Sequence, residues 1–216
     1  MKTNGFPKGT EVACFNYSHV DYSKTKNEYF VSSSLYAHSN RLEIVTCSDD
    51  DFSSNIDIAL LSFLKLYEQL DENNRSKVCL TIVLTSAALK FIKALVASMN
   101  LADCTRIINL NNSEEVKKAC NRAHLFLNPA RNNQMDFVHK ALQKGIPVIC
   151  FESYWTRNII NSKCGFRIPF NHLSYCKNID AFSAHLYTLS TNPCLLQNLS
   201  IGAKERYTEL FGQEKA

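Results

Sequence analysis

Three consecutive aspartates, at 49–51, form the densest cluster of possible metal ligands in this sequence of 216 residues. Hard cations are bound by several carboxylates at once, so a metal site is one interpretation. Neighbouring side chains point in different directions, however, and aspartate is a preferred residue at the amino-terminus of a helix. A loop or helix cap is therefore the favoured interpretation, and we predict no metal site.

Cysteine is the second residue type with possible chemistry. The number of cysteines is odd and no C-x-x-C pair occurs, which argues against a zinc or redox motif. Most stand inside apolar runs, as Cys79 and Cys150 do, where a free thiol behaves as a small hydrophobic side chain. We expect buried free thiols and a reducing, cytoplasmic location. The nine are Cys14, Cys47, Cys79, Cys104, Cys120, Cys150, Cys164, Cys176 and Cys194.

Glycine is scarce, and its positions exclude two phosphate-binding motifs. Positions 10 to 144 contain none, whereas a P-loop and a dinucleotide-binding G-x-G-x-x-G need glycine where the backbone closes on phosphate. Asparagine is abundant and can replace glycine at some left-handed turn positions, although a compositional bias is the simpler explanation. The six glycines are Gly5, Gly9, Gly145, Gly165, Gly202 and Gly212.

Charge and hydropathy exclude further classes. The net charge of +4 is small and dispersed, so we expect neither nucleic acid nor an anionic membrane surface as a partner. No apolar run reaches the length of about 18 residues that a membrane-spanning helix needs. The start of the chain lacks the apolar core of a signal peptide. We expect no transmembrane segment.

From residue 41 onward, β-branched runs alternate with helical spacing of apolar residues. This alternation predicts right-handed βαβ units and an α/β fold, a single Rossmann-like domain with a parallel sheet covered by helices on both faces. Gly145 should end one helix as its C-cap and Ser113 should cap another. The expected strands are 41–47, 77–85, 105–110, 124–128, 146–151 and 165–168, and the expected helices are 55–70, 87–99, 114–122, 135–144, 155–162, 179–190 and 194–211.

Residues 1–40 are less clearly patterned. Glu11–Tyr17 is a possible strand, His19–Glu28 is polar, and Tyr29–Tyr36 fits a strand or a helix. We expect this part to be a lead-in segment of the same domain as residues 41–216.

The later elements carry a family resemblance. The run HLFLNPARNNQMDFVHKALQKGIPV begins at His124, CGFRIP begins at Cys164, and GAKERYTELFGQEKA closes the chain from Gly202. This order resembles the C-terminal, donor-binding domain of GT-B glycosyltransferases of the large retaining family 4, with its Glu-Gly-Phe-Gly loop, Gly-x-Pro-Val-Ile strand and Gly-Gly loop. The similarity covers about residues 41–216 and is most specific at Ala141–Val148 and in the terminal helix.

Measured against that resemblance, the chemistry of the donor site is missing. The family's two glutamates fall on an amide and on a lysine, which cannot accept a hydrogen bond. Its phosphate-binding arginine and lysine are absent, and aspartates 49–51 would repel a diphosphate by about 1–4 kcal/mol per pair. Its Gly-Asp-Gly becomes Thr85-Ser86-Ala87 and its Gly-Gly loop becomes Ser153-Tyr154. The degenerate donor-site positions are Ser48, Ser54, Ser86, Asn132, Lys140, Ser153 and Tyr154.

Shifted alignments do not restore the site. A slip of one or two residues would offer Asp136 in place of Asn132, and a shifted lead-in would offer Lys24 and Lys26 as phosphate bases. No shift supplies the second carboxylate, because Asp136 is the only acidic residue of the helix 135–144.

Histidines and aromatic residues add weaker signals. None of the six histidines pairs with a cysteine or acid at catalytic spacing. His124 and His139 are expected near the presumed cleft, where core or rim positions are the favoured interpretation. Trp155, beside Tyr154, has three open interpretations: packing into a vacated donor cleft, anchoring a partner protein, or stacking on a base.

GT-B enzymes bind donor and acceptor on two domains, and this chain has the length of one, so we expect no activity from it alone. The leading hypothesis is a pseudoenzyme, a non-catalytic domain that serves as a protein-binding or adaptor subunit and needs no cofactor. Asn132, Tyr154, Trp155, Arg157 or the terminal helix would contact the partner, either a GT-B acceptor domain or a larger complex. The alternative is the nucleotide-sugar-binding half of a split or truncated retaining glycosyltransferase. A third hypothesis, an excised fragment of a longer enzyme, is weakly disfavoured by Met1.

Overall fold

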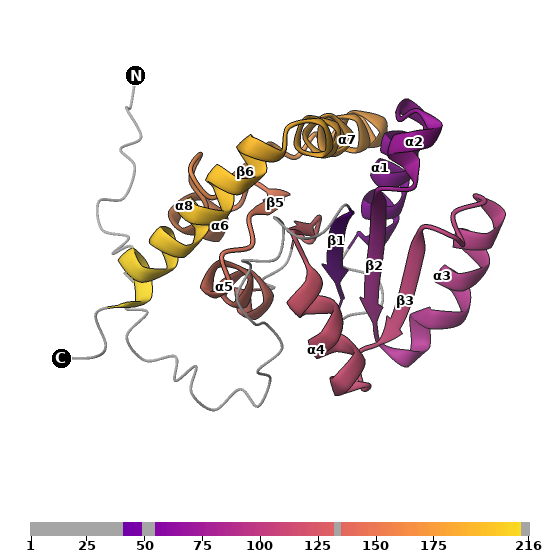
Figure 1. Ribbon diagram of the computed structural model, residues 1–216, viewed down its shortest axis with the longest axis horizontal. Helices are drawn as coiled ribbons and strands as arrows, with labels where there is room; N and C mark the ends of the chain where they lie inside the picture. The colour runs from indigo at the N-terminus through magenta and orange to yellow at the C-terminus, as the bar shows by residue number, and fades with distance from the viewer. Residues whose placement is uncertain (1–40, 49–54, 132–134, 213–216) are drawn as a thin grey trace, which may run out of the picture.

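Six parallel strands form one sheet, in the order β3-β2-β1-β4-β5-β6 (Figure 1). The computed structural model describes residues 41–48, 55–131 and 135–212. The strands are β1 (Leu42–Cys47), β2 (Val78–Leu84), β3 (Thr105–Asn109), β4 (Leu125–Asn128), β5 (Val148–Phe151) and β6 (Gly165–Ile168). The helices are α1 (Ile56–Gln69), α2 (Glu72–Arg75), α3 (Ser86–Ser98), α4 (Ser113–Arg122), α5 (Met135–Gln143), α6 (Tyr154–Ile159), α7 (Tyr175–Thr191) and α8 (Pro193–Phe211). The α/β prediction is confirmed.

The inner strands are apolar on both faces because helices cover both sides. Every residue of β1 and of β2 is buried, as expected for parallel strands between two helical layers. Leu42 to Cys47 pair in register with Val78 to Val83. The near-continuous apolar run of β2 was therefore a correct signal for a central strand.

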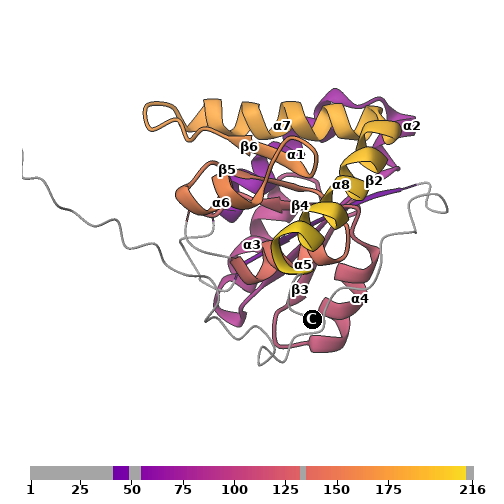
Figure 2. The ribbon, with the colours of Figure 1, turned by 90° about the vertical axis from the view of Figure 1, so that its left-hand side faces the viewer.

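Two apolar clusters hold the layers to the sheet. One lies between the sheet and α1, α3 and α7, with Phe63, Phe151 and Phe182 among its fully buried side chains. The other lies on the opposite face, against α4, α5 and α8, and contains Phe126 and Ala203. Figure 2 shows α7 along one side of the molecule and α8 crossing the region of α5.

Several helix boundaries in the structure differ from the predicted ones. Helix α7 begins at Tyr175, four residues before the expected 179, because the side chain of Ser174 accepts a bond from the N–H of Lys177 and caps it there. Ser113 is the first residue of α4, not its cap: Asn112 accepts the bond from the N–H of Glu115 at 3.3 Å. The short α2 was not expected. Gly145 does end α5, with a positive φ of 70°.

Candidate functional site

Successive strands are added to the sheet first in one direction and then in the other, and the change occurs between β1 and β4. Strands β2 and β3 follow on one side of β1, and β5 and β6 follow on the other side of β4. In open α/β sheets, ligands bind outside the carboxyl ends of the strands at this switch point. The loops after β1, β4 and β5 therefore form the candidate site, which we call the carboxyl edge. Ser54 and Asn132 lie outside the described residues.

A hydrogen bond crosses the switch point. Asn55 adopts a left-handed conformation (φ 48°, ψ 42°), which asparagine tolerates better than most residues. Its side-chain amide donates to the carbonyl of Pro129 at 2.9 Å and so ties the start of α1 to the loop after β4. Ser48 is buried, and its N–H donates to the carbonyl of Val83 at 2.8 Å. The described part of the β1 loop is bonded to its neighbours.

The amino end of α6 is closed by its own side chains. Ser153 accepts a bond from the N–H of Thr156 at 3.2 Å, and the Thr156 hydroxyl accepts one from the N–H of Ser153 at 2.7 Å. This reciprocal capping box satisfies two backbone donors at the end of the helix where anions are otherwise attracted. A Ser-x-x-Thr pattern at 153–156 is a sequence signal that we missed.

Tyr154, Trp155 and Arg157 follow on α6. Tyr154 is 67% exposed, and its ring lies edge-on to that of Trp155, which is half-buried, at a centroid distance of 5.7 Å. Arg157 is exposed, and its Nε lies 3.1 Å from Oε1 of Glu152. The structure thus brings three of the predicted partner-contact residues onto one turn.

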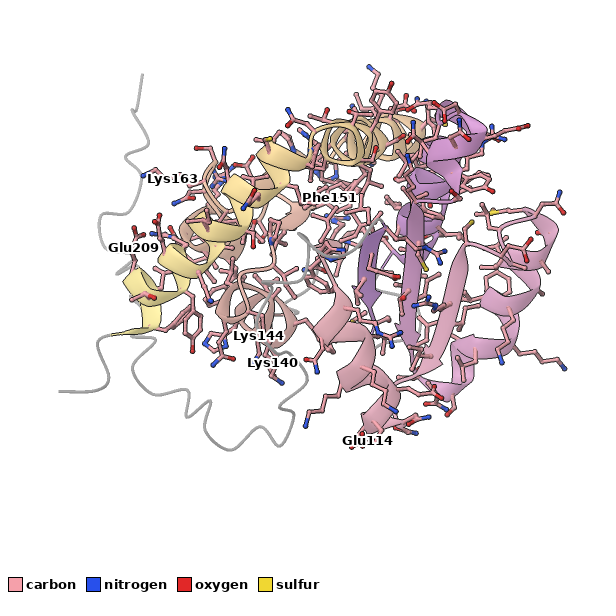
Figure 3. All side chains as sticks on the ribbon, in the orientation of Figure 1. Glu114, Lys140, Lys144, Phe151, Lys163 and Glu209 are labelled. Carbon is pink, nitrogen blue, oxygen red and sulfur yellow. The ribbon has the colours of Figure 1, made fainter. Side chains whose placement is uncertain are left out.

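Lys140 stands where the resemblance places the second glutamate. It projects from α5 on the side of the molecule that carries α4 (Figure 3). Burial lowers the pKa of Lys140, while the nearby carboxylate of Asp136 and the thiols of Cys120 and Cys47 oppose that shift. The position lies near the end of β1 and holds an amine instead of the carboxylate that the resemblance implies.

Ser86, another predicted donor-site position, lies at the start of α3. Its hydroxyl accepts a bond from the side chain of Asn109 at 3.0 Å, which ties it to the end of β3. Arg131, which is not among the predicted site residues, places its guanidinium 4.2 Å from the centroid of the Phe170 ring. The Phe170 ring in turn packs edge-on against that of Phe151. Strand order, not local pattern, brings Arg131 and Phe170 together.

The expectation that His124 lies near the cleft is wrong. His124 exchanges two bonds with Glu43, one from the Glu43 N–H to its Nδ1 at 3.0 Å and one from its own N–H to the Glu43 carbonyl at 2.8 Å. It therefore lies at the amino edge of the sheet, opposite the candidate site. Burial lowers its pKa to about 4. His124 directly precedes β4, so its place at the amino edge of the sheet could have been predicted from the sequence.

His139 belongs to an aromatic cluster with the terminal helix. Its ring lies edge-on to Tyr207 and Phe211, with centroid distances of 5.1 and 4.4 Å, and burial lowers its pKa. Among the described residues, no group of three or more His, Cys, Asp or Glu side chains is placed to hold a metal. Aspartates 49–51 lie outside the described residues.

Comparisons with solved structures identify the fold. The pneumococcal O-GlcNAc transferase GtfA, solved with UDP and GlcNAc, is similar with a TM-score of 0.70 at 13% identity, over 87% of this chain and 36% of that one. The C-terminal domain of the glycosyl transferase group 1 family protein LpcC from Francisella tularensis has a TM-score of 0.64 at 10% identity, over 87% of this chain and 97% of that domain. The chain has the fold of a GT-B C-terminal domain.

The same GT-B fold occurs in an assembly of several proteins. A chain of the Glycosylation Associate Protein (Gap123) complex from Streptococcus agalactiae has a TM-score of 0.62 at 11% identity, over 84% of this chain and 36% of that one. This chain spans about a third of the length of GtfA and of that subunit. No protein-family model and no curated protein matches the sequence. Within the described residues, no helix is long and apolar enough to cross a bilayer.

Proposed function

We propose that this chain is a non-catalytic glycosyltransferase-like domain that binds another protein subunit and serves as an adaptor. The observation that carries the proposal is the capping box of α6. Where the resemblance implies a Gly-Gly loop with free backbone donors, the N–H groups of Ser153 and Thr156 are already bonded to side chains of the same turn. A diphosphate would have to break these bonds to use those donors.

The side chains at the carboxyl edge support the same conclusion through their hydrogen-bonding capacity and existing partners. Lys140 replaces an acceptor for the ribose with an ammonium group, which only donates hydrogen bonds. Asn55 uses its side-chain amide across the switch point, and Arg131 places its guanidinium over Phe170. Both side chains thus have a partner within the domain, and the Arg131 side chain is exposed.

Residues on α6 suit a protein contact. Tyr, Trp and Arg are the side chains most enriched among residues that dominate interface energies, and Tyr154, Trp155 and Arg157 stand on one turn. Membership of a similar chain in the Gap123 complex supports a protein partner. The proposal includes a reducing, cytosolic location, which six buried free thiols support.

A second function has one observation in its favour. GtfA shares the fold and was solved with UDP and GlcNAc, so the alternative is the nucleotide-sugar-binding half of a split or truncated retaining glycosyltransferase. Sugar transfer that requires both this chain and a separate acceptor domain would support it.

Thermal denaturation with a panel of nucleotides and nucleotide sugars separates the two functions. A ligand at a hundred times its Kd adds about 2.7 kcal/mol to the free energy of unfolding. We expect no stabilisation of this chain by UDP-, GDP- or ADP-sugars, with GtfA as the positive control for UDP. Saturable stabilisation that Trp155→Ala abolishes would overturn the adaptor proposal and favour the split enzyme.

The contact surface is tested separately with a partner reconstituted from purified components. Tyr154→Ala should weaken that binding at least about tenfold, as loss of an exposed aromatic anchor does. Tyr187→Ala is the matched control, because Tyr187 is an exposed tyrosine on α7. Equal effects of the two substitutions on binding would show that α6 is not part of the interface.

A further inference from the structure

Three of the seven large apolar side chains that are exposed in the described residues follow the carboxyl ends of β5 and β6. They are Tyr154, Tyr175 and Leu173, which is 99% exposed. Leu173 belongs to the loop 169–174 between β6 and α7, which projects from the end of α7 on the side of the molecule that carries α6 (Figure 2). Single exposed apolar residues are common, but several at one place indicate a contact site.

The loop 169–174 lies beside the connection from β5 to α6. The N–H of Glu152 donates to the carbonyl of Ile168 at 2.8 Å, and the ring of Phe170 packs edge-on against that of Phe151 at a centroid distance of 5.0 Å. The turn of α6 proposed to contact a partner and the loop that carries Leu173 are therefore neighbours at one end of the sheet.

Hydrogen bonds hold this loop in one conformation without using the Leu173 side chain. Oδ1 of Asn171 accepts from the N–H of Leu173 at 2.9 Å. The backbone of Asn171 and the buried side chain of Asn178 exchange two bonds, at 2.8 and 3.0 Å. The hydroxyl of Tyr175 donates to the carboxylate of Asp57 on α1. Leu173 is thus presented on a preorganised loop, which reduces the entropy that binding would cost.

The charge around the loop is positive. From residue 164 to residue 177 the chain has two basic residues, Arg167 and Lys177, and no acidic residue, and both side chains are exposed. Arg131 adds a third exposed cation, which lies over the ring of Phe170. Asp57, bonded at the start of α7, offsets one of the three charges. A second copy of the chain would bring like charges together, whereas an acidic surface would complement them.

We propose that the loop 169–174 belongs to the partner-binding surface and that Leu173 inserts into an apolar pocket of the partner subunit bordered by acidic side chains. The inference deepens the proposed adaptor function and rests on it. Tyr154 and Leu173 contact the same subunit, and Arg131 and Lys177 face its carboxylates. Such charges contribute to specificity and to the association rate more than to affinity.

Photocrosslinking in the cells that encode the chain identifies the partner. One variant carries p-benzoylphenylalanine at position 173, and the matched control carries it at position 201, because Ile201 is exposed on α8. We expect the variant with the probe at 173, and not the control, to be joined to one other protein. Capture alone does not establish the contact, so that protein is then purified and titrated against the full chain.

The titration measures the contribution of Leu173 and of the charges. Leu173→Ser should weaken binding at least about tenfold, since a leucine side chain would no longer be buried. Ile201→Ser should leave the Kd unchanged. Raising NaCl from about 50 to about 500 mM should weaken binding of the unmodified chain, and the same change should have a smaller effect on Lys177→Gln.

Four results would overturn the inference. They are equal Kd values for Leu173→Ser and the unmodified chain, no crosslink at position 173, crosslinks there only between two copies of the chain, and sedimentation with phosphatidylcholine–phosphatidylglycerol vesicles that Leu173→Ser abolishes, which would assign the loop to a membrane surface. Binding weakened by Tyr154→Ala but not by Leu173→Ser would contradict this inference and leave the adaptor function supported. Stabilisation by a nucleotide sugar that Trp155→Ala abolishes would overturn the adaptor function itself.

Discussion

Small polar side chains at the carboxyl edge bond to nearby backbone. Ser153 and Thr156 cap each other's N–H groups, and Asn128 accepts from the N–H of Ala130 at 3.4 Å. Serine, threonine and asparagine commonly form such local bonds at turns and helix ends. Each bond uses a donor that would otherwise be open to a ligand, so the degenerate motif also contributes to local order.

At the same scale, His124 predicts a pH dependence of stability. Its folded pKa is about 4, against 6.5 for the free side chain. Between these pH values the unfolded state binds a proton that the folded state does not. The contribution of neutral His124 to the free energy of unfolding is therefore complete above pH 6.5 and is lost as the pH falls toward 4. The loss at pH 4.5 should be about 2 to 3 kcal/mol. Urea denaturation at pH 7.5 and 4.5 measures it.

His124→Asn is the informative variant, because the amide oxygen can still accept from the N–H of Glu43 but does not titrate. The difference in free energy of unfolding between the two pH values should shrink by the same 2 to 3 kcal/mol. His172→Asn replaces an exposed histidine and should leave that difference unchanged. An unaltered pH dependence in His124→Asn would contradict the assignment.

At the scale of elements, α8 is held by a close backbone approach. Arg206 donates from Nε to the carbonyl of Ile159 at 3.0 Å and from Nη2 to the carbonyl of Asn158. One turn earlier, Gly202 lies so near the 159–163 connection that an added Cβ would stand 2.0 Å from the carbonyl oxygen of Lys163. The terminal helix therefore packs directly on the segment between α6 and β6.

Gly202→Ala has two opposing effects on the free energy of unfolding. Alanine favours a helix over glycine by about 1 kcal/mol, but here it forces the helix away from backbone that cannot yield as a flexible side chain would. We expect overpacking to dominate, with a net loss of about 2 kcal/mol in the free energy of unfolding, measured by chemical denaturation.

Gly212→Ala is the control for that prediction. Gly212 has an ordinary φ of −77° at the end of α8, and among the described residues an added Cβ would meet only the side chain of Thr208, whose methyl group would lie at 3.0 Å. The change should stay within about 0.5 kcal/mol. A stabilising Gly202→Ala would show that α8 does not lie against Lys163.

At the scale of the whole molecule, the cysteines distinguish the buried interior from the exposed helix surfaces. Eight are free in the described residues, six of them buried, and Cys176 and Cys194 are exposed on α7 and α8. Burial raises the pKa of Cys79 to about 11 and of Cys150 to about 12. Because the thiolate is the reactive form, these buried thiols should be inert while the fold is intact.

Alkylation by iodoacetamide, read by mass spectrometry, tests this arrangement. In the native protein at pH 7.5, Cys176 and Cys194 should be modified at least about tenfold faster than Cys150. In urea the rates should converge. Rapid native labelling of Cys150, which lies on β5, would contradict the burial of the central sheet.

The elements were predictable wherever local pattern decides them. The apolar run of β2 and the Gly145 cap were correct, since both depend on residues a few positions apart. The cap of α4 was misplaced because Asn112 and Ser113 are both good capping residues, and only the geometry of the entering chain selects between them. The start of α7 was predicted four residues too late, although Ser174 is also a good capping residue. The reciprocal pair at the start of α6 was overlooked because Thr156 stands where a capping box usually has Glu or Gln.

By itself, the sequence determined the alternation of strands and helices, the parallel sheet, and the loss of glycines and carboxylates from positions that resemble a donor site. Only the tertiary structure decided which polar groups are engaged, as in the bonds of Asn55 to Pro129 and of Glu43 to His124. The reason is physical: these partners are 74 and 81 residues apart. Their meeting depends on the strand order, which places β4 beside β1 and which no local periodicity encodes.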